Sequence, residues 1–140
     1  LYVADAGNNR VLLWHGDPAA NMAPSDTILG QADVGSLDHN RGEYWPSAHS
    51  FNMPYGMAVH DERLFVADTA NSRLLRFDSP LVAQAQALAG QPGFADKGDN
   101  RWLTATRDSL CWRYAISFIG DTAVIVDSGN NRVLLWDVAP

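Results

Sequence analysis

The chain has almost no cysteine, no long apolar run and no excess of positive charge. Cys111 is its single cysteine, so no disulfide can form within the chain, and a small buried side chain is expected there rather than a nucleophile. No segment is apolar enough over its length to predict membrane insertion. The 10 Lys and Arg against 16 Asp and Glu argue against nucleic acid as a partner, because phosphate binding needs clustered positive charge.

The short motifs of common catalytic and metal sites are also missing. There is no Gly-rich phosphate loop, no nucleophile elbow and no metalloprotease motif. The four histidines, His15, His39, His49 and His60, lack ligand spacing. Segments 38–40 and 96–100 carry oxygen ligands without the spacing of an EF-hand. We expect no cofactor and no catalytic residue here, with calcium in these loops as the alternative to ordinary Asx turns.

What the chain does contain is one pattern that occurs three times. Segments 1–14, 64–77 and 124–136 each have an apolar run, the turn Asp-x-x-Asn-x-Arg and a second apolar run. Repeats of this kind determine the architecture. The turn residues are Asp5, Asn8 and Arg10, then Asp68, Asn71 and Arg73, then Asp127, Asn130 and Arg132.

Each copy is typical of a β-hairpin, because β-branched and aromatic residues flank a polar turn. The nearly continuous apolar runs, such as Val11 to Trp14, predict strands that are covered on both faces. We expect the repeated Asp and Arg to pair or to cap backbone groups across the turn. A catalytic role is not expected, since site function is local while repeated residues serve the fold.

The repeat unit extends beyond the hairpin. Further strands are predicted at 26–29, 54–60, the end of 81–89 and 114–119. Polar stretches follow Gly30-Gln31 and Gly90-Gln91. These stretches contain matching pairs, Asn40-Arg41 and Asn100-Arg101, so they are part of the repeat. The Pro-x-Gly turn that begins 54–60 is replaced by Arg113-Tyr114-Ala115 in the next unit. Four antiparallel strands repeated in tandem are the signature of a β-propeller.

The predicted fold class is therefore all-β, a β-propeller of four-stranded antiparallel blades. Residues 1–140 are expected to form about 2.5 blades of one larger propeller domain. The parts are a partial blade at 1–30, a full blade at 54–91, a partial blade at 113–140, and long inter-blade loops at 31–53 and 92–112. The chain begins inside a strand, so we expect a piece of a longer protein whose remaining blades complete the propeller.

The repeated segments resemble NHL repeats over essentially the whole chain. The resemblance is carried by Tyr2-Val3-Ala4-Asp5-x-x-Asn8-x-Arg10-Val11 and its partners, and by Pro54-x-Gly56-Met57-Ala58-Val59, which is similar to the family's innermost strand. NHL repeats form propellers, commonly of six blades. This chain departs from their usual period of about forty residues by adding roughly twenty. The rival family, the tryptophan-aspartate propellers, is suggested by Trp136-Asp137 alone, and the Asp-x-x-Asn-x-Arg turn favours NHL.

The long stretches after Gly-Gln resemble a long-repeat variety of NHL protein met in bacteria, often in exported proteins. The resemblance therefore implies a bacterial protein and favours an extracytoplasmic location.

The long loops and the Asp-x-x-Asn-x-Arg turns are predicted to share one end of the propeller. Loops on a rigid scaffold often carry function, and aromatic residues interleaved with Arg are typical of binding hot spots. The candidate interaction residues are Arg41, Tyr44, Trp45, His49, Arg101, Trp102 and Arg107, with Lys97, Asp99 and Trp112 at the same end. The alternative is that Trp45, Trp102 and Trp112 fold back to bury the loops.

These features predict a non-catalytic scaffold whose loops bind a protein or a polysaccharide. A lactonase-like or lyase-like six-bladed propeller enzyme, with its active site in other blades, is one alternative. The inner strands here supply His60, Tyr55 and Tyr114, with no carboxylate expected beside them. A sensor domain of a larger signalling protein is the other alternative.

Overall fold

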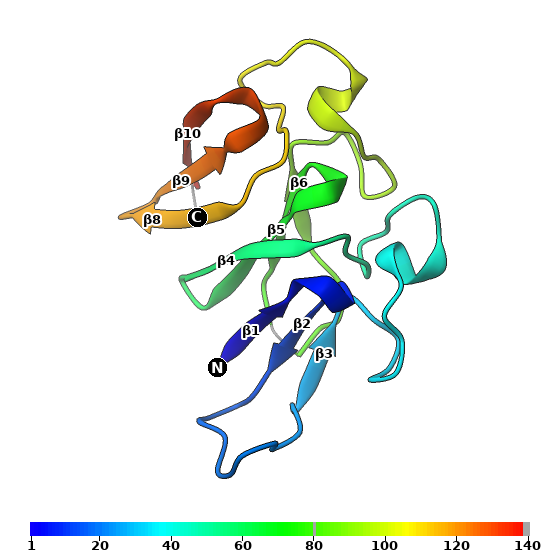
Figure 1. The fold of residues 1–140 in the computed structure, drawn as a ribbon. Helices are drawn as coiled ribbons and strands as arrows, with labels where there is room; N and C mark the ends of the chain where they lie inside the picture. The colour runs from blue at the N-terminus through cyan, green and yellow to red at the C-terminus, as the bar shows by residue number, and fades with distance from the viewer. Residues whose placement is uncertain (80, 139–140) are drawn as a thin grey trace.

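Three antiparallel sheets follow one another along the chain and fan out side by side in the computed structural model, which describes residues 1–79 and 81–138 (Figure 1). Sheet I contains β1 (Tyr2–Asp5), β2 (Arg10–Leu13) and β3 (Thr27–Leu29). Sheet II contains β4 (Pro54–His60), β5 (Arg63–Asp68), β6 (Arg73–Phe77) and β7 (Ala87–Ala89). Sheet III contains β8 (Ala115–Ile119), β9 (Thr122–Asp127) and β10 (Arg132–Asp137). The all-β class and the predicted strands are confirmed.

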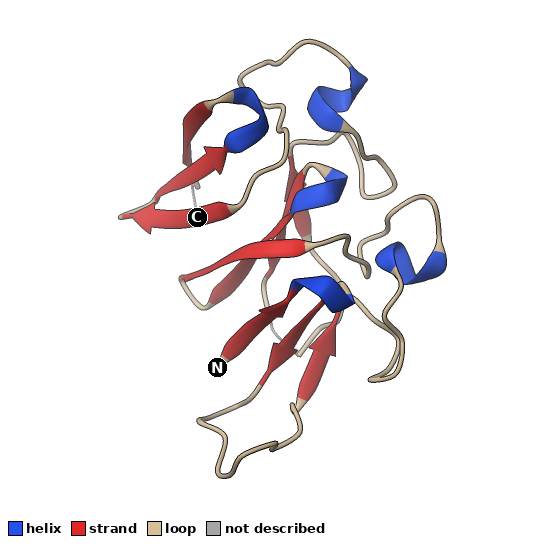
Figure 2. Ribbon diagram, viewed as in Figure 1, coloured by secondary structure: helices blue, strands red, loops and turns tan. Residues whose placement is uncertain are grey.

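Short 3-10 turns lie at one end of the sheets. The hairpin turns are η1 (Ala6–Asn8), η3 (Thr69–Asn71) and η5 (Ser128–Asn130), and the long loops contain η2 (His39–Gly42) and η4 (Asp99–Trp102). Figure 2 shows all of these turns (blue) on the same side of the molecule, away from the opposite hairpin tips. We call this side the loop end. The long loops and the repeated turns therefore share one end, as the alternation of a strand meander predicts.

The middle sheet is covered on both faces. In β5, every residue after Arg63 is buried. One apolar cluster fills the space between sheets I and II and includes Val11, Val66 and Leu75, while a second includes Phe65 and Ile125 between sheets II and III. Sheet II thus has a packed neighbour on each side.

Sheet III differs from the prediction of strands covered on both faces. In β10 the exposed fraction is 57% for Val133 and 67% for Leu135, and burial alternates along the strand. The reason is that β10 packs against a neighbouring sheet on one face only, so the expectation is wrong for this strand.

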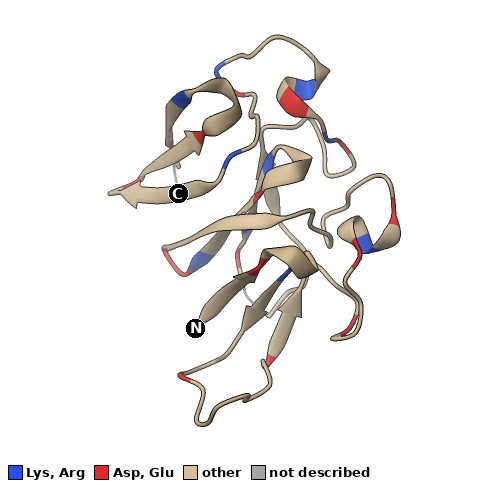
Figure 3. Cartoon of the chain, viewed as in Figure 1, with Lys and Arg blue, Asp and Glu red and all other residues tan. Residues whose placement is uncertain are grey.

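The repeated Asp and Arg pair across each hairpin turn, as predicted. In the middle copy, Asp68 Oδ2 accepts hydrogen bonds from Arg73 Nε at 2.7 Å and from Asn71 Nδ2 at 2.8 Å. Its Oδ1 accepts the backbone N–H of Asn52 at 2.7 Å. The equivalent Asp–Arg distances in the outer copies are also 2.7 Å. Figure 3 shows one acidic (red) and one basic (blue) segment facing each other near each turn.

The arginine of each turn also binds the long loops. Arg73 Nη2 donates to the carbonyls of Ser47 and Ser50, both at 2.9 Å, and its Nη1 donates to the carbonyl of Phe94. Arg132 repeats the first two bonds with Thr106 and Ser109. The loops thus belong to the repeat, because each one is fixed by equivalent contacts.

Asparagine pairs connect each loop to the next sheet. Asn40 in η2 and Asn71 in η3 exchange two side-chain hydrogen bonds of 3.2 and 2.8 Å. Asn100 in η4 and Asn130 in η5 do the same, at 2.9 Å in both directions. An amide side chain is both donor and acceptor, so two such groups satisfy each other when buried. These pairs fix the loop end of each sheet to its neighbour.

The Gly-Gln dipeptides have a structural role that the sequence analysis missed. Gln91 Nε2 donates to the carbonyls of Ser72 at 3.0 Å and Gly98 at 2.8 Å, so its amide joins the hairpin turn to the loop. Gly90 has φ +94°, and a Cβ there would lie 2.6 Å from Leu110 Cδ1. Glycine is required at this position because the backbone is left-handed and the loop packs directly against it.

Arg113 is a buried residue at a position where the sequence departs from the repeat. Its guanidinium is fully buried, and Nη2 donates to the carbonyl of Asp68 at 3.3 Å. Within the described residues, Nε and Nη1 have no hydrogen-bond partner. Burial lowers the pKa of Arg113 to about 9, against the favourable charge of Asp68. An unpaired buried charge is costly, so we expect Arg113 to lower the stability of this unit. The equivalent segment of the previous unit, Pro54 to Gly56, is not a turn as the sequence predicts but the bulged start of β4.

Candidate functional site

Exposed aromatic side chains from both long loops meet at the loop end. Tyr44 from the first loop and Trp102 and Trp112 from the second line a shallow pocket of about 160 Å³, together with Ala70, Lys97, Gly98 and Asp99. Trp45 lies beside Tyr44, with ring centroids 4.9 Å apart. We call Tyr44, Trp45, Trp102 and Trp112 the aromatic cluster.

The alternative in which Trp45, Trp102 and Trp112 fold back to bury the loops is wrong. The exposed fraction is 54% for Trp45, 68% for Trp102 and 39% for Trp112. The loops are packed instead by Phe51 and Leu110, which are almost fully buried. Because these two residues provide the internal packing that long loops need, the tryptophans are free to face solvent.

Lys97 connects the two loops within the cluster. Its Nζ lies 3.5 Å from the Tyr44 ring centroid and 5.6 Å from that of Trp45. The same ammonium donates to the Tyr44 carbonyl at 2.6 Å. A cation over an aromatic ring at an exposed site contributes about 0.5–1 kcal/mol. Lys97 therefore holds the Tyr44 ring in place and adds a positive charge at the rim of the pocket.

Asp99 and Gly98 position the tryptophans of the second loop. Asp99 Oδ2 accepts the indole N–H of Trp112 at 3.2 Å, and its Oδ1 accepts the hydroxyl of Ser72 at 2.7 Å. At Gly98 (φ +112°) a Cβ would lie 2.2 Å from Trp102 Cε2, so only glycine lets the Trp102 ring lie against this backbone. Both rings are held while exposed, which is favourable for binding because little ordering remains to be done.

Cys111 lies near this site but is not suited to nucleophilic chemistry. Burial, followed by the charges of Asp99 and Asp127, raises the pKa of its thiol to about 11. The thiolate is the nucleophilic form of cysteine, so this thiol is unreactive near neutral pH.

The groups that the site offers to a ligand are the aromatic faces of the cluster, the Lys97 ammonium and the Asp99 carboxylate.

The other candidate interaction residues lie outside the cluster. Arg41 donates to the carbonyls of Gly30 and Gln31, and Arg101 donates to the carbonyl of Gly90 and to Asp108, so both arginines stabilise their own loops. His49 contacts the carbonyl of Ala83, and the carbonyl of Arg107 accepts the indole N–H of Trp136. Only Tyr44, Trp45 and Trp102 of the predicted set come together.

The expectation that no carboxylate lies beside His60 is wrong. His60 Nε2 lies 3.1 Å from Asp121 Oδ1 and 3.6 Å from Asp61 Oδ2. Asp61 belongs to the turn between β4 and β5, and Asp121 to the turn between β8 and β9. Asp61 directly follows His60 in the sequence. The approach of Asp121 arises from the packing of sheet III against sheet II, which the spacing in the sequence does not reveal.

Three of the polar side chains in the loop segments considered for calcium are used within the protein. Asn40 and Asn100 form the amide pairs described above, and Asp99 binds Ser72 and Trp112. Within the described chain, the one group of three or more His, Cys, Asp or Glu side chains close enough to share a metal ion is His60, Asp61 and Asp121.

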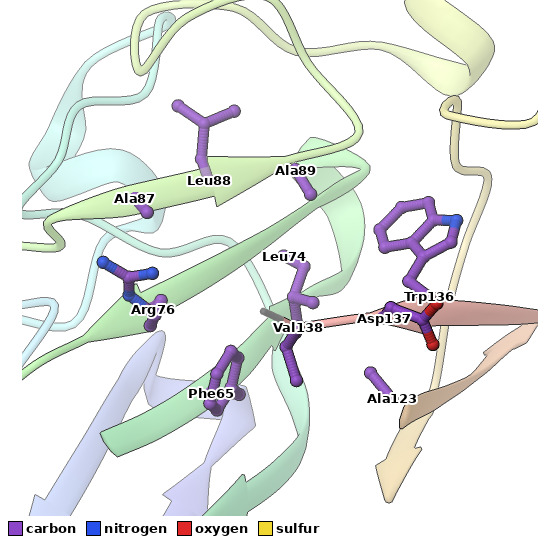
Figure 4. Close-up of a pocket in the computed structure, with 10 residues that line it drawn as sticks. All are labelled: Phe65, Leu74, Arg76, Ala87, Leu88, Ala89, Ala123, Trp136, Asp137 and Val138. Carbon is purple, nitrogen blue, oxygen red and sulfur yellow. The ribbon is translucent and has the colours of Figure 1, made fainter. Parts of the chain in front are cut away.

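An apolar cavity of about 290 Å³ lies between sheets II and III (Figure 4). Its lining residues are Phe65, Leu74, Arg76, Ala87, Leu88, Ala89, Ala123, Trp136, Asp137 and Val138. Figure 4 shows Trp136 and Val138 of the C-terminal segment opposite the strands of sheet II. The lining is mainly apolar, with few polar groups to orient a ligand.

The chain was also compared with known proteins. No model of a protein family matches it, and no curated protein does. In residues 1–79 and 81–138, no helix is both long and apolar enough to cross a membrane.

Proposed function

We propose that the chain is part of a bacterial NHL-type β-propeller that binds a protein or a polysaccharide at its loop end, without catalysis. The propeller is supported by the order β4-β5-β6-β7 in sheet II, an up-and-down arrangement of four strands. It is also supported by the fan of three sheets, in which β4 contacts both β1 and β8. Remaining blades of the same propeller would complete the ring.

The observation that carries the binding function is the aromatic cluster. Tyr44 and Trp102 expose 64% and 68% of their surfaces, although Lys97 and Gly98 hold both rings in place. Exposed aromatic side chains that are fixed by the scaffold are typical of binding hot spots. Their position on two loops of a rigid β-scaffold is also where binding residues are usually found.

Both ligand classes suit this chemistry. Aromatic rings beside one ammonium and one carboxylate are suited to a protein surface, whose hot spots are rich in Tyr and Trp. The same rings can pack against the apolar face of a sugar, while Lys97 and Asp99 offer a donor and an acceptor for hydroxyl groups.

The two alternatives give different expectations. A lactonase-like or lyase-like enzyme would carry its acids and bases on the inner strands. On the inner strands of this chain, the Tyr55 and Tyr114 rings instead pack against each other, with their centroids 5.3 Å apart. A sensor domain would use the same loop end and pass the binding signal to an attached domain.

The experiment uses two probes on one protein. Leu103, which is 76% exposed beside Trp102, is replaced by a photo-crosslinking amino acid to capture protein partners, and the labelled protein is applied to an array of purified polysaccharides. Met22, 99% exposed in the β2–β3 connection at the opposite end, is the matched crosslinking control. Capture at Leu103 alone, or array binding that Trp102→Ala abolishes, supports the proposal. Equal capture at both positions, with array binding unchanged in Trp102→Ala, contradicts it.

A further inference from the structure

The end opposite the loops brings three metal-ligating side chains together. His60 and Asp61 lie where β4 turns into β5, and Asp121 lies where β8 turns into β9. Their ligand atoms are all within 4.8 Å of one another. Figure 3 shows acidic positions (red) at the tips of both turns. The group thus spans two sheets.

The His60 ring is held in the orientation that directs Nε2 to the carboxylates. It stacks on Phe118 of sheet III with centroids 4.4 Å apart and an angle of 9° between the rings. The side chain of His60 is only 17% exposed. A ligand that is already ordered loses little conformational entropy when it binds an ion.

The two carboxylates remain available for an ion. Their side chains are 66% exposed at Asp61 and 77% at Asp121. Within the described residues, His60 is the one side chain in close polar contact with either of them. The neighbouring Arg63 lies 3.7 Å from Asp78 instead. The two carboxylates therefore make a locally negative site that attracts a cation.

The cluster does not follow the repeat. At the corresponding positions of the next unit, Ile119 replaces His60 and Gly120 replaces Asp61. The histidine and the aspartate are therefore not repeated from one unit to the next. Residues that depart from a repeat are candidates for a local function.

We propose that His60, Asp61 and Asp121 bind a divalent transition-metal ion of the zinc type. Zinc binds nitrogen and oxygen ligands at about 2.0–2.2 Å, and a tetrahedral site then places its ligands roughly 3.3–3.6 Å apart. The observed distances of 3.1 and 3.6 Å from Nε2 are close to this range. An imidazole ligand favours zinc over calcium or magnesium, which prefer oxygen. Water would complete the coordination, and the ion would tie sheet II to sheet III.

The experiment is isothermal titration of the metal-free protein with zinc chloride. Wild type is compared with His60→Gln, Asp121→Asn and, as a matched control, Glu62→Gln, which removes a neighbouring charge that lies outside the cluster. We expect one saturable site in wild type and in Glu62→Gln, and its loss in the other two variants. Equal zinc binding in wild type and His60→Gln, or no saturable binding in wild type, would overturn the proposal.

Thermal unfolding supplies a second measurement, in which each variant is compared with itself in the absence and presence of zinc. Zinc should raise the Tm of wild type and of Glu62→Gln, because an ion that binds only the folded state stabilises it. It should leave the Tm of Asp121→Asn unchanged, and calcium should raise none of them. A zinc-induced shift in Asp121→Asn as large as in wild type would contradict the site. The aromatic cluster lies at the other end, so this result is independent of the loop-end proposal.

Discussion

The fully buried pair of Asp68 and Arg73 provides the strongest test of how the repeat is held together. Both side chains have an exposed fraction of 0%, and the Arg73→Ala variant leaves the Asp68 carboxylate buried without its cation. It also removes the donors that bind the carbonyls of Ser47, Ser50 and Phe94. Breaking one side of a buried ion pair costs about 3–5 kcal/mol. We therefore expect the free energy of unfolding to fall by that amount.

The chain contains its own control for this prediction. Arg10 makes the same 2.7 Å contact with Asp5, but these side chains are 13% and 25% exposed. Water can replace part of the lost interaction there, so Arg10→Ala should cost about 1 kcal/mol. Urea unfolding followed by circular dichroism gives both values, and the slope of the transition should remain the same.

A double variant separates the lost charge pairing from the lost packing. If the unpaired carboxylate causes most of the damage, Asp68→Asn combined with Arg73→Met should be more stable than Arg73→Ala alone. The reasoning would be refuted if Arg73→Ala destabilised the protein no more than Arg10→Ala. A loss of ligand binding in Arg73→Ala, without any loss of stability, would assign Arg73 to the binding site instead.

Three further predictions concern single positions. Gly90→Ala should lower the free energy of unfolding by about 1–3 kcal/mol in a denaturant titration, because its Cβ meets Leu110 and the backbone is left-handed, whereas Gly7→Ala, with open space around it, should be nearly neutral. Arg113→Met should stabilise the protein below about pH 9. The pKa of Arg113 falls from 12.5 to about 9 on folding, so the unfolded chain holds more protons above that pH. The free energy of unfolding of the wild type therefore rises with pH above about 9. Urea titrations at increasing pH should show a smaller difference in stability between Arg113→Met and wild type. Cys111, with its pKa raised to about 11, should react with iodoacetamide at neutral pH much more slowly in the folded protein than in the unfolded one.

The sequence predicts the local structure well. Strands and hairpin turns follow from short-range patterns, and the pairing of Asp68 with Arg73 lies within one hairpin. Equivalent residues such as Gly30-Gln31 and Gly90-Gln91 locate the short strands that precede them.

Features that depend on the packing of distant segments were not predictable in the same way. Exposure of Trp102 depends on Leu110 and Phe51 filling the loop interiors, which composition does not reveal. The approach of Asp121 to His60 joins residues 61 positions apart and depends on how sheet III lies against sheet II. For the same reason the sequence did not predict the amide contacts of Gln91. The recurrence of the Gly-Gln dipeptide at 30–31 and 90–91 is the signal that indicates a structural role for this glutamine.

The central claim is that the aromatic cluster at the loop end binds the ligand. The most direct measurement is the affinity of the captured protein or polysaccharide for Trp102→Ala and Tyr44→Ala, with Met22→Ala as the control at the opposite end. Removing a hot-spot side chain costs about 2 kcal/mol or more, so the account predicts that each cluster variant weakens binding roughly thirtyfold while Met22→Ala binds normally. Unchanged affinity in both cluster variants, with the fold intact by circular dichroism, would contradict the account.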